Sequence, residues 1–348
     1  MKVLVIGTFG IEQFASHISD NLINLGHDVL EHEISSTVKL KLQNQLASKA
    51  LSTLENMLSF TQSGISKRIK NIKKSILHFS PDLILVTYDY LTSHEVDKMK
   101  EISHAPIALW FPDSVAGFPR GLFLNANYDF LFFKDTYIVN ALKPFISGSV
   151  FYMPECFNDL KMHSTEYEKL KYQCDLSTAG GLHSYRVAFF NQLTELDLNI
   201  KLWGPKNSNW IKLGKLTKYY QGEPVYNEEK YAAFKEAKIV INNLHYTEID
   251  CVNVRTFEIA GAGGFQLIDY RRGLNELFEI GNEIVSFNNI DELKELIIYF
   301  LEHDDERELI ANKAKTKALK CHTYRHRLEL IIDTIFSNKN GFESALLK

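Results

Sequence analysis

One stretch in the carboxy-terminal half of the chain combines two carboxylates, a guanidinium and a glycine pair. Asp250 and Glu258 are separated by seven residues, and Arg255 stands three residues before Glu258. On a helix over 253–262, Arg255 and Glu258 share one face. A guanidinium binds phosphate oxygens in a bidentate manner, and a carboxylate accepts hydrogen bonds from vicinal hydroxyls. The spacing favours a nucleoside diphosphate, with Arg255 on the pyrophosphate and Glu258 on the ribose, although a surface ion pair fits it equally well.

A second glycine turn, Gly180 and Gly181, follows a predicted strand and leads into a helix that carries Arg186. The backbone amides and the positive dipole end of a helix N-terminus attract phosphate. Arg186, in the first turn of that helix, would add a second positive charge against the same diphosphate. Such turns are frequent in α/β proteins that bind no phosphate, so this pattern gains weight only together with Arg255.

Two further side chains stand directly after predicted strands, where parallel sheets place their ligands. His245 follows a strand near 238–242 and could reach a bound sugar or phosphate, although a partly buried histidine with satisfied hydrogen bonds explains it equally well. Asp113 follows a strand near 106–110 and could act as a general base that takes a proton from an acceptor hydroxyl. The alternative for Asp113 is a turn or helix-cap aspartate, which is ordinary after proline.

The stretch around Arg255 resembles the carboxy-terminal signature of GT-B glycosyltransferases of the CgeB-like (spore maturation protein) group. The shared positions are Asn253, Arg255, Phe257, Glu258, Ile259, Gly263, Gly264, Phe265 and Leu267. Near the end of the chain, His322, Thr323, Tyr324 and Arg327 resemble a second element of that group. The resemblance is good over 170–330 and looser in the amino-terminal half.

This resemblance implies transfer of a sugar from a nucleotide diphosphate sugar, with a UDP-sugar as the expected donor and no other cofactor. Arg186, Arg255 and the turn amides would neutralise the diphosphate without a divalent metal, and the chain contains no Asp-x-Asp metal motif. In related retaining families, two glutamates separated by seven residues hold the donor sugar and the ribose. Here Asp250 stands in the first position, one methylene shorter, and Glu258 in the second. The loop that holds the base in those families corresponds to Val225. The spacing of Asp113 resembles that of the catalytic aspartate of inverting members.

Composition is that of an ordinary globular protein with two domains. The chain has 348 residues, 45% of them hydrophobic, and a net charge of −4, which disfavours a nucleic-acid partner. Its four cysteines are scattered without metal-ligand spacing and indicate free thiols in a reducing compartment. No apolar segment approaches the roughly 20 residues of a membrane helix. We therefore expect a soluble, cytoplasmic protein.

Short apolar runs alternate with amphipathic stretches, which predicts an α/β fold with parallel sheets. Strands are expected near 2–6, 28–33, 82–87, 106–110, 129–133, 149–153, 174–178, 199–203, 238–242, 265–268 and 284–287. Helices are expected near 12–25, 40–60, 66–78, 93–101, 136–146, 184–195, 227–236, 253–262, 274–278, 290–303, 305–320 and 323–336.

These elements form two Rossmann-like domains, as in the GT-B architecture. Residues 1–155 would bind the acceptor, 156–322 would bind the donor, and 323–348 would return to the first domain. Because open parallel sheets bind ligands at the carboxyl ends of their strands, the active site is expected in the cleft between the domains.

The acceptor stays open between a glycan, a lipid-linked glycan and a protein. Residues 65–78 form a basic amphipathic helix that could contact an anionic membrane surface, or could simply pack on its own sheet. A sugar-nucleotide epimerase of the same fold and a non-catalytic nucleotide-sugar-binding protein are the alternative functions.

Overall fold

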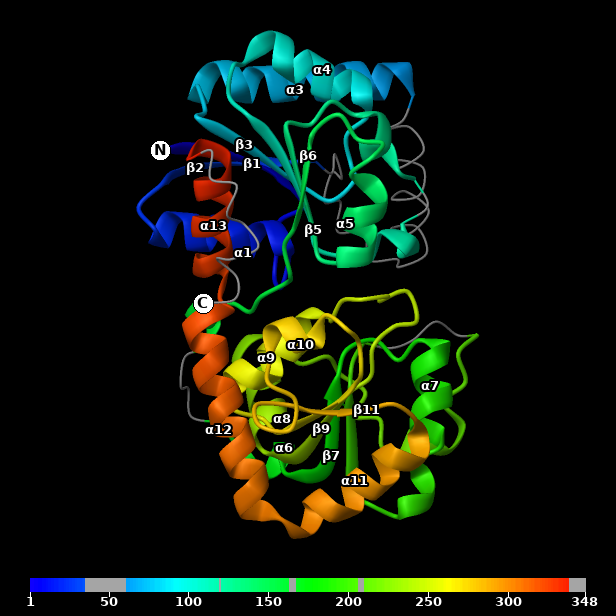
Figure 1. Ribbon diagram of the computed structural model, residues 1–348. Coiled ribbons are helices and arrows are strands. Elements are labelled where there is room, and N and C mark those ends of the chain that lie inside the picture. Colours follow the sequence, from blue (N-terminus) through cyan, green and yellow to red (C-terminus); the bar gives the residue numbers. More distant parts are fainter. Residues whose placement is uncertain (35–60, 119, 163–166, 206–209, 338–348) are drawn as a thin grey trace. The chain divides into compact units, whose positions relative to one another are not determined.

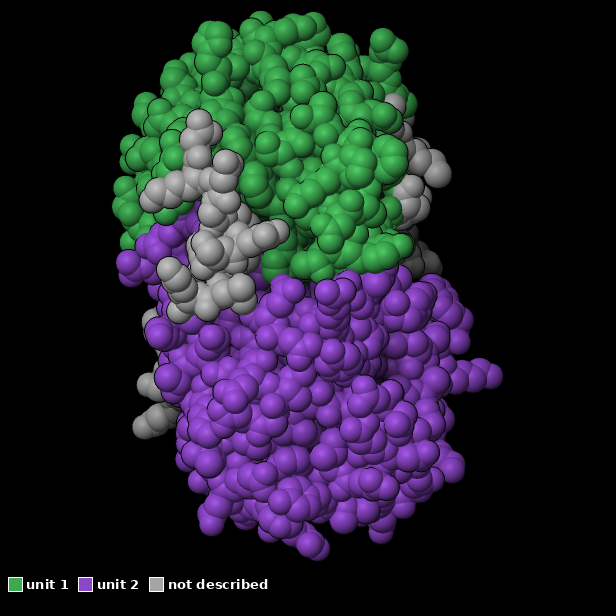
Figure 2. Space-filling view, viewed as in Figure 1, with its two compact units in different colours: residues 1–153, 332–338 green, residues 154–331, 339–348 purple. Residues whose placement is uncertain are grey.

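The computed structural model describes residues 1–34, 61–118, 120–162, 167–205 and 210–337. The chain divides into two compact units, coloured separately in Figure 2. Unit 1 contains Met1–Met153 and Ile332–Asn338, and unit 2 contains Pro154–Ile331. The predicted helix over 40–60 lies outside the described residues.

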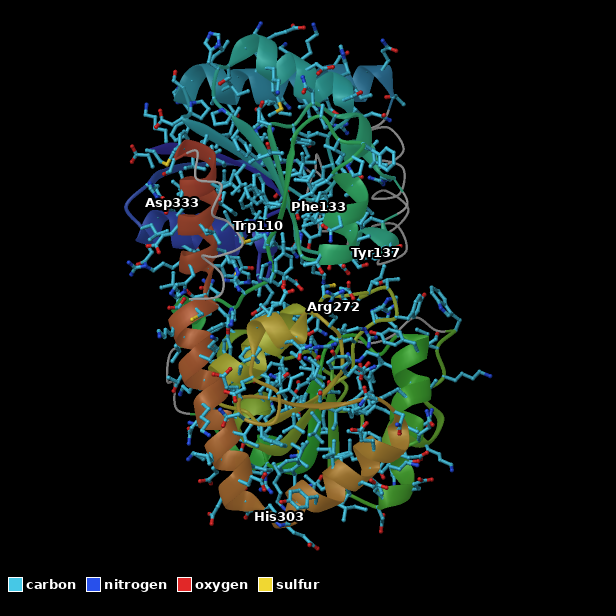
Figure 3. All side chains as sticks on the ribbon, viewed as in Figure 1. Trp110, Phe133, Tyr137, Arg272, His303 and Asp333 are labelled. Carbon is cyan, nitrogen blue, oxygen red and sulfur yellow. The ribbon has the colours of Figure 1, made fainter. Side chains whose placement is uncertain are left out.

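Unit 1 is built on a six-stranded parallel sheet in the order β2-β1-β3-β4-β5-β6. Its strands are β1 (Lys2–Gly7), β2 (Asp28–Glu33), β3 (Leu83–Thr87), β4 (Ile107–Phe111), β5 (Phe130–Phe133) and β6 (Ser149–Tyr152). Its helices are α1 (Phe14–Asn24), α3 (Gln62–Phe79), α4 (Ser93–Ile102) and α5 (Thr136–Leu142). Trp110 of β4, labelled in Figure 3, packs its ring edge-on against Phe14 of α1, with centroids 4.7 Å apart.

Unit 2 is built on a five-stranded parallel sheet in the order β11-β10-β9-β7-β8. Its strands are β7 (Cys174–Ala179), β8 (Ile200–Trp203), β9 (Ala237–Asn242), β10 (Gln266–Asp269) and β11 (Val285–Phe287). Its helices are α6 (Lys169–Tyr172), α7 (Ser184–Asn191), α8 (Asn227–Lys235), α9 (Val254–Ala262), α10 (Leu274–Leu277), α11 (Ile290–Glu302) and α12 (Asp304–Cys321). The last helix, α13 (Tyr324–Phe336), contains the unit limit between 331 and 332.

Both faces of the unit 2 sheet are covered, as its strand sequences require. Successive side chains of a strand point to opposite faces, so Val240 of β9 joins one hydrophobic cluster while Ile239 and Ile241 join another. Helices α8 and α9 belong to the Val240 face, and α7 and α11 to the opposite face. Helix α12 lies beside α9 (Figure 1). Burial on both faces explains why these strands are short, continuous apolar runs.

The elements match the sequence prediction closely outside the undescribed segments. Every predicted strand has an observed counterpart, with limits that differ by at most one residue. Some helix limits differ more: α3 begins at Gln62 rather than near 66, and α5 ends at Leu142 rather than near 146. Near the start of unit 2, the structure adds a short 3-10 turn, Asp159–Lys161, and α6, which the sequence did not predict. None of the described helices has the length and apolar character needed to cross a membrane.

Candidate functional site

The strand order of unit 2 marks where a ligand would bind. From β7 the chain proceeds to β8 on one side, and β9 then pairs on the other side of β7. At such a switch point the two loops leave in opposite directions and open a crevice outside the carboxyl ends of the strands. Gly180 and Gly181 follow β7 at this edge, and Asn243 and His245 follow β9.

Arg255 lies on α9 and spans this crevice. Its two terminal nitrogens donate to the backbone oxygen of Ala179 at the end of β7, at 3.0 Å, and to that of Asn243 beyond β9, at 3.1 Å. Its Nε is buried and has no hydrogen-bond partner among the described residues. Burial lowers the pKa of Arg255 from its ordinary value. The guanidinium therefore holds the two strand ends together, while its Nε–H makes no hydrogen bond with the described residues.

Arg186 supports the same turn from inside the unit. Its Nε donates to Asn243 Oδ1 at 3.0 Å, and its terminal nitrogens donate to Thr178 Oγ1 at 2.6 Å and to the Gly181 carbonyl at 3.0 Å. Only 1% of the residue is exposed. Burial, with the nearby charge of Arg255, lowers the pKa of Arg186 well below its ordinary value. Arg186 thus orders the turn, and its direct contact with a ligand stays a prediction.

Gly180 is the point on which both guanidiniums converge. Its φ is +123°, a left-handed conformation that favours glycine. A Cβ at this position would lie 3.0 Å from an Arg255 terminal nitrogen and 3.1 Å from one of Arg186. All the described hydrogen bonds of the two guanidiniums end on uncharged oxygens. The turn therefore carries concentrated positive charge with neutral hydrogen-bond partners, which suits a bound anion.

Glu258, one turn after Arg255, faces a cation that the sequence analysis did not single out. Lys230 of α8 places its Nζ 2.6 Å from Glu258 Oε1, and both side chains are mostly buried. The two residues are far apart in sequence, and Lys230 sits among other charges on α8, so no local spacing identifies this pair.

The remaining donor candidates lie on loops of the same unit. Val225 is buried just before α8. Asp250 is half-buried, and its carbonyl accepts from the Gly273 amide at 2.9 Å. His245 packs edge-on against Tyr185, with ring centroids 4.5 Å apart, and burial lowers its pKa. These positions agree with a common site, but their predicted contacts with base and sugar stay predictions.

Asp269, the last residue of β10, is a second side chain without a predicted role. Its Oδ2 accepts from the Leu244 amide at 3.1 Å, and its Oδ1 is buried with no partner among the described residues. Burial raises the pKa of this carboxyl to about 6 against the pull of Arg271 and Arg255. The sequence signal that could have identified Asp269 is its position as an acidic residue at the end of the apolar strand that follows Gly263 and Gly264.

Asp113 belongs to unit 1, where it follows β4 as predicted. It lies near Tyr90, whose pKa is raised by burial and also by the negative charge of Asp113. A carboxylate at the carboxyl end of a central strand is suitably placed for acid–base chemistry within its unit. Its role as the catalytic base stays a prediction.

Comparisons with known proteins agree with this architecture. Residues 186–333 match a family model described as "Glycosyl transferase-like". None of the curated proteins matches the chain in sequence. The solved structure of sucrose-phosphate synthase from Thermosynechococcus elongatus aligns with a TM-score of 0.70 at 9% identity, over 97% of this chain and 100% of that one.

Two other solved structures also align over nearly the whole of both chains. HepE from Anabaena, in complex with UDP-glucose, aligns with a TM-score of 0.68 at 13% identity, over 97% of this chain and 100% of that one. A glycosyltransferase from Rickettsia africae aligns with a TM-score of 0.66 at 12% identity, over 99% and 98% of the two chains. These similarities establish the fold as GT-B-like, with two parallel α/β units, as the sequence predicted.

Proposed function

We propose that this chain is a glycosyltransferase that moves a sugar from a nucleotide diphosphate sugar, most simply a UDP-sugar, to a hydroxyl acceptor. The observation that carries the proposal is the convergence of Arg186 and Arg255 on Gly180 at the switch point of unit 2. The family match over 186–333 and the fold support it.

The chemistry follows from where charge develops during transfer. When the bond between the sugar and the diphosphate breaks, the leaving diphosphate gains negative charge, and fixed dipoles and cations stabilise that charge. In our proposal Arg255 and the amides of the turn at Gly181 bind the diphosphate, while Arg186 holds that turn in place. Val225 lies against the base and Glu258 binds the ribose.

The sugar and the acceptor complete the proposed reaction. Asp250 and His245 would contact the donor sugar, a hexose in the simplest case. If the reaction inverts configuration, Asp113 takes the proton from the acceptor hydroxyl. If it retains configuration, Asp113 has no such duty. The acceptor would be a glycan, a lipid-linked glycan or a protein.

The proposal also covers the family subgroup, the metal requirement and the cellular location of the protein. We propose a CgeB-like member acting in the cytoplasm without a divalent metal, since Arg255 and the turn amides supply the positive charge. Activity in excess EDTA tests the metal point. Peripheral membrane contact would use the exposed cations of 65–78, because Ile72 and Ile76 are buried in the core of unit 1.

A thermal-shift panel of nucleoside diphosphates and UDP-glucose tests the donor site. A ligand at 100 times its dissociation constant stabilises the folded state by about 2.7 kcal/mol. We expect such a shift in the wild type and its loss in Arg255→Ala. Arg325→Ala, which removes an exposed arginine of α13, is the matched control and should keep the shift. The proposal fails if no nucleoside diphosphate shifts the wild type, or if folded Arg255→Ala responds equally.

Product analysis separates the three candidate activities. Transfer releases nucleoside diphosphate in proportion to glycosylated acceptor, an epimerase returns an isomeric nucleotide sugar, and a binding protein does neither. Donor hydrolysis above background, abolished in Arg255→Ala, would argue against a binding protein.

A further inference from the structure

The Lys230–Glu258 pair is a buried ion pair whose value for folding alone is small. Nζ and Oε1 are 2.6 Å apart, and the exposed fractions of the two side chains are 12% and 10%. Removing both charges from water costs about as much as their mutual attraction returns. Such pairs are retained in some systems because they fix one geometry.

The ammonium occupies only one edge of the carboxylate. Lys230 donates to Oε1. No other described residue donates a hydrogen bond to the Glu258 carboxylate. An ionised carboxylate has about four lone-pair sites on its two oxygens. Oε2 therefore keeps acceptor capacity, and its direction is set by the ammonium that holds Oε1.

The pair also joins two parts of the proposed nucleotide site. Lys230 lies near the start of α8, directly after the loop that contains Val225. Glu258 lies on α9, one turn after Arg255, whose guanidinium is at the Gly180 turn. In a nucleotide the ribose stands between the base and the diphosphate. Glu258 correspondingly shares a helix with the diphosphate arginine and is paired with the helix that follows the proposed base contact.

We propose that Lys230 is a positioning residue: it orients the Glu258 carboxylate toward the ribose hydroxyls and so makes the site selective for ribonucleotide donors. The proposal rests on the proposed function. The donor class would be sugars carried on ribonucleoside diphosphates, with 2′-deoxyribonucleoside diphosphate sugars bound less well. Without Lys230, a largely buried Glu258 would take up a proton or turn toward water, and either change removes an ionised acceptor from the ribose.

The test measures dissociation constants of UDP and 2′-deoxyuridine diphosphate by calorimetry. A hydrogen bond to a charged group that only UDP can make corresponds to a preference of about 10-fold or more in the wild type. We expect Lys230→Met and Glu258→Gln each to reduce that preference to within about 3-fold. If Lys230 acts through Glu258, the double variant should discriminate no less than Glu258→Gln alone.

Matched variants separate positioning from folding. Lys230→Arg retains the cation and should recover part of the preference. Lys238→Met removes a lysine from the exposed pair with Asp175 and should leave the preference unchanged. If Lys230→Met does not fold, Lys230→Gln, which retains an N–H donor, replaces it, and an intermediate preference is expected.

The other possible results of the binding experiment contradict either the role of Lys230 or the proposed function. A folded Lys230 variant with the full wild-type preference overturns the inference, as does a double variant in which the two losses add. A wild type that binds UDP and its deoxy form alike overturns it while leaving the proposed function intact. A wild type that binds neither, nor any other nucleoside diphosphate, overturns the proposed function itself.

Discussion

At the scale of single residues, chemically identical side chains at this site have different duties. Arg186 and Arg255 both reach Gly180, but Arg186 is 1% exposed and each of its three nitrogens donates a hydrogen bond, whereas Arg255 is half-buried and its Nε has no partner among the described residues. Glu258 has a cation at 2.6 Å, whereas Asp269 has a buried oxygen that no described residue hydrogen-bonds. Environment, rather than residue type, decides which of these groups can respond to a ligand or a proton.

Asp269 predicts a pH dependence of stability. Its pKa is about 6 in the folded state and 3.8 in the reference state, so within that window the folded protein binds the proton more tightly. Stability therefore falls as pH rises from 4 through 6, and the ionised carboxylate costs roughly 3 kcal/mol at neutral pH. Asp269→Asn removes this cost. We expect its stability relative to the wild type to be roughly 2 kcal/mol better at pH 7.5 than at pH 4.

Urea denaturation of both proteins across this pH range measures the effect. A constant offset between Asp269→Asn and the wild type at all pH values would show that burial does not perturb this carboxyl. An advantage that grows as pH falls would show a shift of opposite sign.

At the scale of elements, α9 carries both Arg255 and Glu258, and its ends fix where they lie. Asn253 caps the helix by accepting from the Thr256 amide at 3.2 Å. The same side chain donates to Asn242 Oδ1 at the end of β9, at 3.0 Å. At the other end, Gly263 closes the helix with a φ of 78°. The cap thus sets both the start of α9 and its register against the central strand.

Asn253→Ala should weaken stability and nucleotide binding together. Loss of an N-cap costs about 1 kcal/mol, and the bond to Asn242 adds to that loss. Because α9 then loses its anchor to β9, we expect UDP affinity to fall about 3- to 10-fold. The control is Asn289→Ala at the N-cap of α11, where the side chain accepts from the amides of Asp291 and Glu292. It should cost similar stability without changing UDP affinity, and equal affinity losses in both variants would contradict the anchoring role.

At the scale of the whole molecule, Arg327 connects two segments of unit 2 that lie next to its limits in the sequence. These limits follow Met153 and Ile331. Arg327 is 1% exposed and donates to the carbonyls of Pro154 at 3.0 Å and Glu155 at 3.3 Å. It thereby ties the start of unit 2 to the helix that ends it.

His322 completes this arrangement and explains why a histidine accompanies the arginine in the motif. Its Nδ1 lies 2.9 Å from an Arg327 terminal nitrogen and must accept, since a guanidinium only donates. Its Nε2 therefore carries the proton and donates to the Leu277 carbonyl at 3.0 Å. Burial and the adjacent Arg327 charge hold the pKa of His322 well below its ordinary value. The imidazole is neutral and has one tautomer.

Arg327→Lys should destabilise the protein although it retains the charge. A lysine ammonium cannot span the planar set of acceptors that a guanidinium bridges, so buried carbonyls lose their donors. We expect a loss of roughly 2–4 kcal/mol in urea denaturation. Arg325→Lys, on the exposed side of the same helix, should change stability by less than about 0.5 kcal/mol. Similar losses in the two variants would show that Arg327 has no special structural role.

The sequence determined the fold class and most of the elements. Apolar runs of strand length, alternating with amphipathic helices, imply covered parallel sheets, because both periodicities are local properties of the chain. The helix predicted over 253–262 likewise matches α9, and the residues that cap it in the structure, Asn253 and Gly263, lie at its own ends in the sequence.

Only the tertiary structure decided which side chains share the site and in what state. Lys230 meets Glu258 because α8 packs on α9, and Asp269 is perturbed because β10 lies beside β9. The same folding buries Arg186 beneath the turn that the sequence expected it to flank. Pair distances, burial and pKa shifts depend on contacts between residues distant in sequence, and no local pattern of residues encodes them.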